Sequence, residues 1–327
     1  MKIVAITRVL NEADIIEAFT RHTAVFVQHH VFMDNGSSDG TIEILTALKQ
    51  EGLPITVFQS RAVTFNEGNA LTYMYNVAMR EHAPDWVFCL DADEFIDDRA
   101  VSDGARAYLE RLMSGSPRIE VVKIPMVNYF ATSQDNPAEV VVPVRITRRR
   151  PPSDAYKIIL RGGLPEADIV IEHGSHWAWL RSRPINSVVN SDLWLAHYSE
   201  RSPFQYIAKF VRGWSKVLAS GQAEVGRKTA YHYHDPFDFL RDKPGNFLRN
   251  PRFMGFKNEV PDLIDDPARY CGGGLRYSAS VDEAMRAVRS LMGYLDDLAT
   301  QHGRLIDEFP FVRAQVQDWE RQINKLF

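Results

Sequence analysis

Residues 86–94 read WVFCLDADE, an apolar run that ends in an acidic cluster. Short apolar runs of this kind are typical of strands that are covered on both faces of a sheet. Residues 2–6 (KIVAI) and 30–33 (HVFM) are two further runs of the same kind. Each is followed by polar residues, TRVLNE at 7–12 and DNGSSD at 34–39. The sequence therefore predicts three buried strands with polar side chains at their carboxyl ends.

Helical patterns separate these strands. Apolar residues recur at helical spacing over 13–27 and 67–82, and over a shorter helix that carries Ile42, Leu45 and Leu48. Residues 55–58 (ITVF) add one more apolar strand between the second and third helices. Strands that alternate with helices in this way favour a parallel, doubly wound sheet.

The rhythm changes after Arg99. One helix is expected over 102–113, and runs rich in Val and Ile at 119–127, 139–147, 157–161 and 168–172 predict a mixed or antiparallel extension of the sheet. Residues 203–220 are expected to be helical, and two amphipathic helices, over 281–301 and 310–327, are expected near the end of the sequence. Residues 222–280 show no assignable pattern.

Composition excludes several classes of protein. The net charge of −4 gives no indication of a nucleic-acid partner. No apolar stretch reaches 18 residues, so no transmembrane segment is expected, and the first residues are too soon interrupted by charge to form a signal peptide. Cys89 lies within an apolar run and is expected to be buried, far in sequence from Cys271. We expect a cytoplasmic location for such a chain.

The polar clusters that follow the strands are the candidates for chemistry. In an open parallel sheet, ligands bind beyond the carboxyl ends of the strands, where these clusters converge. Asp91 and Asp93 are two residues apart in an extended segment, so their carboxylates point to the same side. Two hard oxygen ligands of this kind suit Mg²⁺ or Mn²⁺. The alternative is a pair of loop acids that face water.

Three stretches together resemble family 2 glycosyltransferases with the GT-A fold. They are MKIVAITRVLNEADIIEAF (1–19), VFMDNGSSDGT (31–41) and DWVFCLDADEF (85–95). In that family, the Asn-Glu after the first strand and the acidic turn after the second bind the nucleotide, and the Asp-x-Asp holds the metal and the diphosphate. The resemblance implies an α/β fold with a GT-A-type, doubly wound mixed sheet, a Rossmann-like nucleotide-binding half and a helical C-terminal extension.

The resemblance assigns roles to particular residues. It implies that the nucleotide-sugar contacts Thr7, Arg8, Asn11, Glu12, Asp34 and Asp91, with Asp39 completing the acidic turn. Residues 195–203 (LAHYSERSP) with Lys209 are similar to a segment of one bacterial subgroup. Two departures are visible, because Asn35 stands where the family usually has a second Asp and the usual catalytic Glu-Asp pair has no clear match.

The resemblance also implies a domain organisation. Residues 1–220 are expected to form a catalytic domain, with its nucleotide-sugar-binding half at 1–97 and its acceptor half at 98–220. Residues 221–327 are expected to form a mainly helical extension.

The metal site and the catalytic base leave alternatives open. We expect Asp91, Asp93 and His176 to hold the metal, with His197 as the competitor of His176, because GT-A enzymes often add one His from a later strand. Glu94 is expected to hold the metal loop by hydrogen bonds. An inverting transfer needs a general base, and the candidate carboxylates are Asp154, Glu166, Asp168 and Glu172. The predicted catalytic set is Asp93, Asp168 and Glu172.

A basic run, Arg145 with Arg148 to Arg150, is interpreted as a solvated loop, with contact to donor phosphate or to an anionic membrane-linked acceptor as the alternative. Trp177, Trp179 and Trp194 are interpreted as packing residues rather than as platforms for sugar rings.

These observations predict a glycosyltransferase that depends on Mn²⁺ or Mg²⁺. It would move a sugar from a nucleotide-sugar, expected to be UDP-linked, to a hydroxyl of a saccharide, a lipid-linked or another acceptor. The alternative is a non-catalytic protein that binds nucleotide-sugars or carbohydrates on the same fold. A cytoplasmic position includes the inner face of the membrane, where a lipid-linked acceptor would lie.

Overall fold

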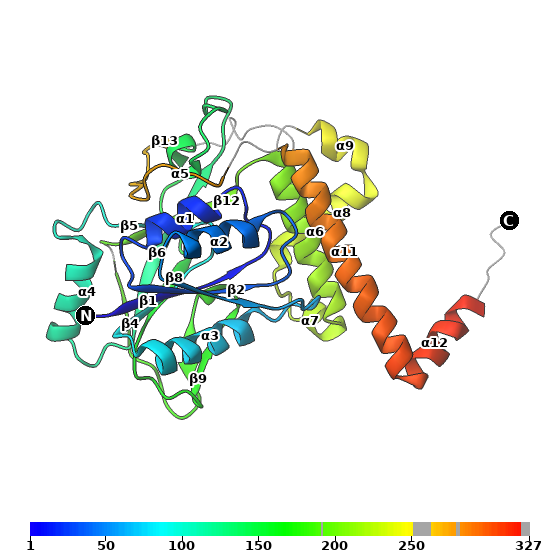
Figure 1. Ribbon diagram of the computed structural model, residues 1–327, viewed down its shortest axis with the longest axis horizontal. Helices are drawn as coiled ribbons and strands as arrows, with labels where there is room; N and C mark the ends of the chain where they lie inside the picture. Colours follow the sequence, from blue (N-terminus) through cyan, green and yellow to red (C-terminus); the bar gives the residue numbers. More distant parts are fainter. Residues whose placement is uncertain (191, 251–262, 279–281, 322–327) are drawn as a thin grey trace.

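The structure is a computed structural model that describes residues 1–190, 192–250, 263–278 and 282–321. Figure 1 shows a central sheet with helices on both faces and two long helices along one side. The fold class expected from the sequence, α/β with a mixed sheet and a helical C-terminal part, is confirmed.

The first four strands form the parallel half of the sheet. They are β1 (Ile3–Val9), β2 (His29–Asp34), β3 (Ile55–Gln59) and β4 (Trp86–Cys89). They pair in the order β3-β2-β1-β4, all parallel. This order brings the carboxyl ends of β1 and β4 side by side, as the strand patterns predict.

Antiparallel strands continue the sheet beyond β4. They are β8 (Tyr156–Arg161), β6 (Val121–Phe130), β7 (Arg148–Arg149) and β13 (Ile264–Asp265), and β11 (Ser187–Val189) pairs parallel with β6. The pairings of β8 with β4 and β6, of β6 with β7 and of β7 with β13 are antiparallel. The expected mixed extension is thus present.

Two more strands, β5 and β12, lie next to the acidic turn that follows β4. β5 (Glu94–Asp97) directly follows the acidic turn, and β12 (Trp194–Glu200) pairs antiparallel with β5 and parallel with β6. In this register His197 lies opposite Glu94 and beside Asn128. Pairing between strands therefore places a histidine against the acidic turn.

Helices cover both faces of the parallel strands (Figure 1). α1 (Ile16–Thr23) and α2 (Thr41–Gln50) pack on one face, and α3 (Glu67–His82) packs on the other. Alternate residues of one strand enter different cores, with Ile3 and Ala5 on the α1 side. Such two-sided burial explains why the strands are apolar throughout. Cys89 is fully buried in the core on the α3 side, as expected.

Two of the predicted strand runs are corrected. Residues 139–147 do not form a strand, because Pro143 opens a short helix, α5 (Val142–Arg145), and has no N–H to donate to a neighbouring strand. Residues 168–172 contain a strand, β9 (Ile169–Ile171), but it pairs with β10 (Ala178–Leu180) in a separate two-stranded sheet. The 3₁₀ turn η1 (His173–Ser175), with Gly174 at φ +73°, lies between β9 and β10.

Further helices complete the chain. They are α4 (Gly104–Gly115), α6 (Pro203–Ala219), α7 (Gln222–Gly226), η2 (Tyr231–Tyr233), α8 (His234–Asp242), α9 (Pro244–Arg249), α11 (Glu283–Glu308) and α12 (Pro310–Arg321). The predicted helix over 203–220 is confirmed, whereas the one over 281–301 continues to Glu308. Residues 322–327 of the last predicted helix lie outside the described residues. No helix in the described ranges combines the length and the apolar character needed to cross a membrane.

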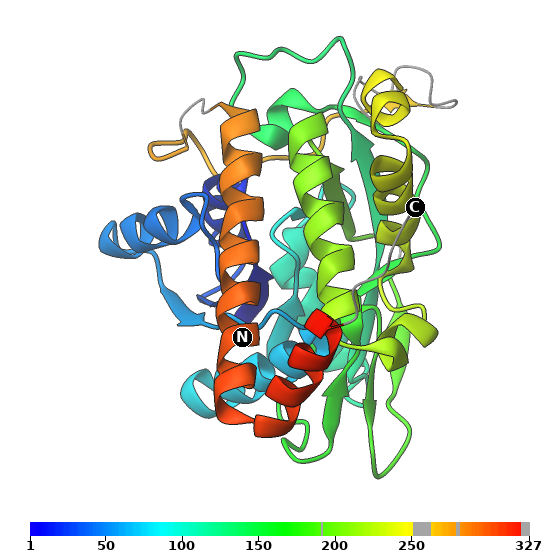
Figure 2. The same ribbon diagram turned by 90° about the vertical axis from the view of Figure 1, so that its right-hand side faces the viewer.

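α11 lies alongside α6, as Figures 1 and 2 both show, and also contacts the turn after β2. Ser38 Oγ donates to the carbonyl of Arg289 (3.0 Å), and a Cβ at Gly293 would lie 2.4 Å from Ser38 Oγ. Tyr294 donates its hydroxyl to the carbonyl of Val63 (3.2 Å). The division of the chain into 1–220 and 221–327 stays a prediction.

Glu17 joins the C-terminal segment to α1. Its carboxylate is fully buried and accepts the backbone N–H groups of Arg276, Tyr277 and Ser278 at 2.7, 2.8 and 2.6 Å. Arg21 donates a further hydrogen bond from one turn along α1. Burial alone would raise the pKa of Glu17, but these donors hold it below its ordinary value.

We expect Glu17→Gln to lower the free energy of unfolding by about 2 kcal/mol, because three backbone donors lose a charged acceptor. The contribution of Glu17 is complete above its ordinary pKa of 4.5 and is lost as the pH falls through the lowered pKa of the folded state. Denaturant titrations of wild type and variant should therefore converge in acid. Glu43→Gln, an exposed change on α2, is the control; equal stabilities of wild type and Glu17→Gln at neutral pH would contradict this role.

Candidate active site

A cleft of about 680 Å³ opens at the carboxyl ends of β1 and β4, where ligands bind in open α/β sheets. The residues after β1, the acidic turn after β4 and one face of α6 contribute to its lining. Its charged and histidine residues are Arg8, Glu12, Glu67, Asp91, Asp93, Glu94, Lys157, His176, His197, Glu200, Lys209, Arg212, Lys216 and His232.

Asp91 is paired with a buried lysine. Lys157 Nζ lies 2.5 Å from Asp91 Oδ2 and 3.1 Å from Glu94 Oε1. Burial alone would lower the pKa of Lys157, but the two carboxylates raise it, so the amine stays charged. Glu94 Oε2 accepts the backbone N–H of Asp91 (2.9 Å) and so holds the turn in shape. This is the hydrogen-bonding role expected of Glu94.

Asp93 is surrounded by two positive groups and a histidine. Lys209 Nζ from α6 donates to Asp93 Oδ2 at 2.6 Å, and Arg201 Nη1 and His197 Nε2 lie 3.7 and 3.8 Å from the same oxygen. Burial alone would raise the pKa of Asp93, but Lys209, His197 and Arg201 hold it below its ordinary range. The carboxylate is therefore ionised at neutral pH.

Arg201 connects this acid to the loop after β1. Its guanidinium is only 2% exposed and contacts Glu12 at 2.5 Å and Asp14 at 2.6 Å as well as Asp93. Burial raises the pKa of Glu12 to about 7, although the charge of Arg201 opposes the shift. One buried cation thus links two of the polar clusters that follow the strands.

Asp93, Glu94 and His197 could hold a metal ion. One ligand atom from each lies within 4.8 Å of the others. His197 Nδ1 is hydrogen-bonded to Asn128 Oδ1 (2.8 Å), which leaves Nε2 on the side of Asp93. Glu94 Oε1 is buried, with Lys157 Nζ at 3.1 Å as its charged neighbour and no well-aligned hydrogen bond from the described residues. Two carboxylates and an imidazole with a free acceptor atom fit Mn²⁺ or Mg²⁺.

Three further cations lie in the cleft without an acidic partner. No carboxylate of the described residues comes within 4.0 Å of Arg8, Arg212 or Lys216. Lys216 Nζ donates to the carbonyl of Ala62 (2.6 Å), and Arg212 donates to the carbonyl of Leu10 (3.0 Å). Burial, with the charges of Arg8 and Arg212, lowers the pKa of Lys216 to about 7. An anion placed among these three groups would relieve their repulsion.

The loops after β1 and β2 are joined by Asn11. Its side-chain oxygen accepts the N–H of Ser38 (2.8 Å), and its own N–H donates to Ser37 Oγ (2.8 Å). Asn11 has φ +59°, a left-handed conformation that Asn tolerates better than most residues. Asp34 is fully buried below this turn and accepts the N–H groups of Gly36 and Ser37. In this structure, then, Asp34 supports the turn and does not line the cleft.

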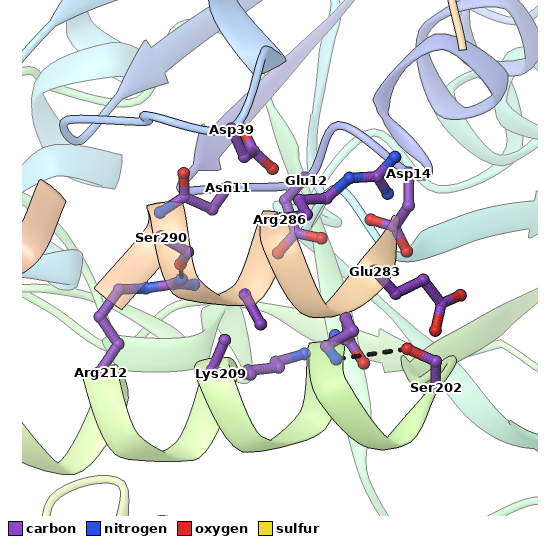
Figure 3. A pocket seen from close by; sticks show the side chains of 13 residues that line it. Asn11, Glu12, Asp14, Asp39, Ser202, Lys209, Arg212, Glu283, Arg286 and Ser290 are labelled. Atoms are coloured by element: carbon purple, nitrogen blue, oxygen red, sulfur yellow. Dashed lines mark hydrogen bonds between the residues drawn. The ribbon is translucent and has the colours of Figure 1, made fainter. Parts of the chain in front are cut away.

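A second, small cavity of about 30 Å³ lies behind the cleft, between α6 and the first turns of α11. Its polar side chains point towards one another in Figure 3: Asn11, Glu12, Asp14 and Asp39 from the N-terminal loops, Ser202, Lys209 and Arg212 from α6 and its N-cap, and Glu283, Arg286 and Ser290 from α11. A space of this size holds about one water molecule. It is a packed polar interface between two helices and a loop rather than a substrate site.

Residues 5–111 match the family model described as glycosyl transferase family 2. This part of the chain is similar to family 2 glycosyltransferases. The resemblance expected from the sequence is thereby confirmed over about the first third of the chain. No match to a curated protein was found.

Solved structures of two glycosyltransferases are similar to this chain. Glucosyl-3-phosphoglycerate synthase from Mycobacterium tuberculosis, in complex with Mn²⁺, uridine diphosphate and glucosyl-3-phosphoglycerate, is 20% identical over 38% of this chain, with a TM-score of 0.27. The match spans 44% of that enzyme's chain. A mannosyltransferase from Pyrobaculum calidifontis, in complex with GDP-Man and Mn²⁺, is 14% identical over 97% of this chain and 83% of its own, with a TM-score of 0.36.

The family motifs come together only in part. Arg8, Glu12, Asp91, Asp93 and His176 line the cleft, and their roles as donor and metal ligands stay predictions. Asn11 lines the adjoining small cavity instead. Thr7 is fully buried and hydrogen-bonded to His30 (2.8 Å), because its side chain faces the core rather than the strand end.

Two predicted catalytic acids lie outside the cleft. Asp168 accepts hydrogen bonds from the backbone and hydroxyl of Ser182, and Glu172 is exposed where β9 ends. Neither side chain lines the cleft, because β9 and β10 form a separate small sheet. Of the acids expected from the sequence, the structure brings only the residues of the acidic turn and Glu12 to the cleft.

His176 and His197 also differ in position. His176 is exposed at the cleft and is hydrogen-bonded through Nδ1 to the carbonyl of Tyr156 (2.7 Å). It does not belong to the group of possible metal ligands among the described residues, whereas His197 does. The geometry therefore favours the alternative that the sequence analysis left open.

Sequence reasoning named Arg8 and Lys209 but missed three further cations of the site, Lys157, Arg212 and Lys216. Lys157 is the one charge in the apolar strand run KIIL, a pattern that indicates a buried lysine with an acidic partner. Lys209, Arg212 and Lys216 are spaced by three and four residues, which places them on one face of a helix. Both signals are visible in the sequence, but their acidic and carbonyl partners are 60 or more positions away.

We expect His197→Ala to lower the affinity for Mn²⁺ by roughly tenfold or more, since one of the side chains that would contact the metal is lost. The same change at His176 is the matched control, because that ring lines the same cleft outside the ligand group. Calorimetry of Mn²⁺ binding in the absence of nucleotide measures both. A loss of affinity in His176→Ala with wild-type affinity in His197→Ala would restore the assignment of His176.

Proposed function

We propose that this chain is a glycosyltransferase that uses a nucleotide-sugar donor and a divalent metal ion. The observation that carries the proposal is that Asp93, Glu94 and His197 lie close enough together to bind one metal ion. All three line the cleft at the ends of β1 and β4. The match of residues 5–111 to family 2 glycosyltransferases supports the same reaction class. The Mn²⁺ complexes of the two similar enzymes make Mn²⁺ the first ion to test.

The distribution of charge suits a diphosphate. Breaking the bond between a sugar and a diphosphate leaves negative charge on the leaving group, and fixed positive groups stabilise that charge as it develops. Arg8, Arg212 and Lys216 supply such groups from one side of the cleft, without carboxylates to neutralise them. We assign them to the donor's phosphate oxygens.

The metal belongs to the other side of the cleft. We assign Asp93, Glu94 and His197 to hold it, and a bound divalent ion supplies further stabilisation of the departing diphosphate. Lys157 and Lys209 neutralise Asp91 and Asp93 before a ligand arrives, so the acids cost less to bury. Asp91, held by Lys157, positions the turn from which Asp93 and Glu94 extend.

The acceptor hydroxyl needs a base if the transfer inverts configuration. Glu67 and Glu200 line the cleft outside the acidic turn, and we assign the base to one of these two in place of Asp168 and Glu172. Glu67 accepts the N–H of Gly174 (3.1 Å), so its carboxylate is held at the cleft. A uridine diphosphate sugar as donor, a saccharide or lipid-linked hydroxyl as acceptor and a cytoplasmic location complete the proposal, the last in accord with two free cysteines.

We expect Asp93→Asn to lower metal-dependent turnover of the donor by roughly a hundredfold or more, the scale at which loss of one key electrostatic group acts. The measurement is hydrolysis or transfer across a panel of nucleotide-sugars with Mn²⁺, with EDTA as a second arm. Asp168→Asn, an acid outside the cleft, is the matched control and should keep wild-type activity. Undiminished turnover in EDTA, or an Asp93→Asn variant as active as wild type, would refute the metal mechanism. If wild type acts on no donor, the binding-protein alternative is favoured.

We also expect Lys216→Met to weaken binding of uridine diphosphate about tenfold, the usual effect of losing a hydrogen bond from a charged group. Calorimetry in EDTA isolates this contribution, because no metal then bridges protein and phosphate. Lys228→Met, an exposed lysine that does not line the cleft, is the control. Equal affinities of wild type and Lys216→Met would remove this lysine from the phosphate site.

A further inference from the structure

The outer face of α11 carries an apolar stripe that no other part of the described chain covers. Met285, Val288, Met292 and Leu295 are each 50 to 60% exposed and follow one another at intervals of three, four and three residues. This is the spacing of core positions in a coiled coil. The opposite face of α11, which includes Tyr294, is the one that packs against α6 and the turn after β2.

Exposed apolar residues continue to the end of α11 and onto α12. Leu305 near the end of α11 and Phe309 at its C-cap are further exposed apolar residues, though off the line of the stripe, and Phe311 and Trp319 are exposed on α12. α12 packs against α11 and projects from the rest of the molecule in Figure 1. In Figure 2, α11 and α12 both lie towards the viewer, so the two helices share one side of the molecule.

The exposed area approaches what a stable interface requires. Eight large apolar residues between Met285 and Trp319 are 47 to 70% exposed. Because burying an aliphatic side chain removes roughly 100 Å² and an aromatic one roughly 200 Å², these fractions amount to an area on the order of 600 Å² per chain, most of the roughly 800 Å² that each partner buries in a stable interface. Such an area is at the upper end of what monomeric proteins usually leave open to water.

The charged residues beside the stripe indicate which partner binds there. Arg289 and Asp296 lie seven residues apart along one border of the stripe, and neither side chain forms an ion pair within the described residues. If a second α11 packs antiparallel across a two-fold axis near Met292, Arg289 of each helix faces Asp296 of the other. One sequence therefore provides both halves of two equivalent ion pairs.

The same charges disfavour a lipid surface. α11 has three arginines and five acidic residues, so the helix has a net charge of −2. Helices that lie on membranes are usually rich in Lys and Arg on the polar face, because the lipid headgroups are anionic. The stripe is bordered by one positive and one negative residue, and these pair with each other when two copies of α11 pack antiparallel. A second copy of the chain therefore fits the stripe better than a membrane does.

We propose that the chain forms a symmetric dimer through the apolar face of α11, with α12 of each copy extending the contact. The two α11 helices run antiparallel, and Arg289 and Asp296 form reciprocal ion pairs across the axis. This inference is independent of the proposed function, because every residue that it uses lies outside the cleft.

Light scattering coupled to size-exclusion chromatography, across the micromolar range, tests the dimer. Wild type should elute with twice the mass of one chain, and Met292→Glu should elute with the mass of one chain. Val25→Glu, an equally exposed apolar residue near α1, is the control and should stay dimeric. Circular dichroism should be the same for all three, since both changes are at exposed positions.

Charge exchange tests the register. Arg289→Asp and Asp296→Arg should each weaken the dimer about tenfold, because each places like charges opposite one another. The double variant should recover wild-type dimerisation, since the ion pairs re-form with their signs exchanged. If the double variant stays as weak a dimer as the single variants, Arg289 and Asp296 do not face each other across the interface, and the proposed register is wrong.

The proposal is overturned if wild type has the mass of one chain at every concentration. It is also overturned if Met292→Glu leaves the dimer intact, since the contact would then lie elsewhere. Sedimentation with anionic or neutral vesicles covers the remaining possibility: binding of wild type that Met292→Glu abolishes, with no dimer in solution, would assign the stripe to a membrane.

Discussion

The buried guanidinium of Arg201 is the contact on which the arrangement of the cleft depends. It lies between the loop after β1 and the acidic turn after β4, and it bonds to Glu12 and Asp14 while standing 3.7 Å from Asp93. Without a cation at this point, three carboxylates would face one another in a region almost closed to water. Arg201 therefore does not merely accompany the acidic residues; it is the reason that they can be brought together.

Pairing of buried charges also divides the rest of the cleft into two sides, one where cations are paired with carboxylates and one where they are not. Lys157 and Lys209 pair with the acids of the turn after β4. Arg212 and Lys216 donate instead to backbone carbonyls, and Arg8 from β1 has no carboxylate within 4.0 Å among the described residues. On the acidic side, a metal ion can replace a lysine as the partner of a carboxylate. On the other side, the unpaired cations can bind an anion. A ligand that carries both a metal and phosphate oxygens satisfies the two sides together, which neither a bare metal nor a bare sugar does.

The strand pattern and the order of polar clusters were predictable because both follow from local sequence. A strand buried on both faces must be apolar throughout, and the topology of alternating strands and helices then puts the strand ends at one edge. The error over 139–147 has a local cause, because Pro143 outweighs the Val-rich pattern around it. The choice between His176 and His197 could not be made from sequence, since it depends on the pairing of β12 with β5 and β6. The structure does not place Thr7 at the predicted nucleotide site for a related reason. Side chains alternate along a strand, so a shift of one residue decides whether a side chain near the strand end points to the core or to the cleft.

The contact between α11 and the turn after β2 has a consequence for how the protein is made. Ser38 and Arg289 meet across a separation of 251 residues, and Gly293 leaves the space that Ser38 needs. The turn is translated 251 residues before its partner on α11, so during that part of translation it must keep its shape without this neighbour. During that interval the turn is held by contacts within the N-terminal loops, among them those of Asn11, Asp34 and Asp39. The many hydrogen bonds within these loops, which look redundant in the finished molecule, then keep the turn in shape until α11 is made.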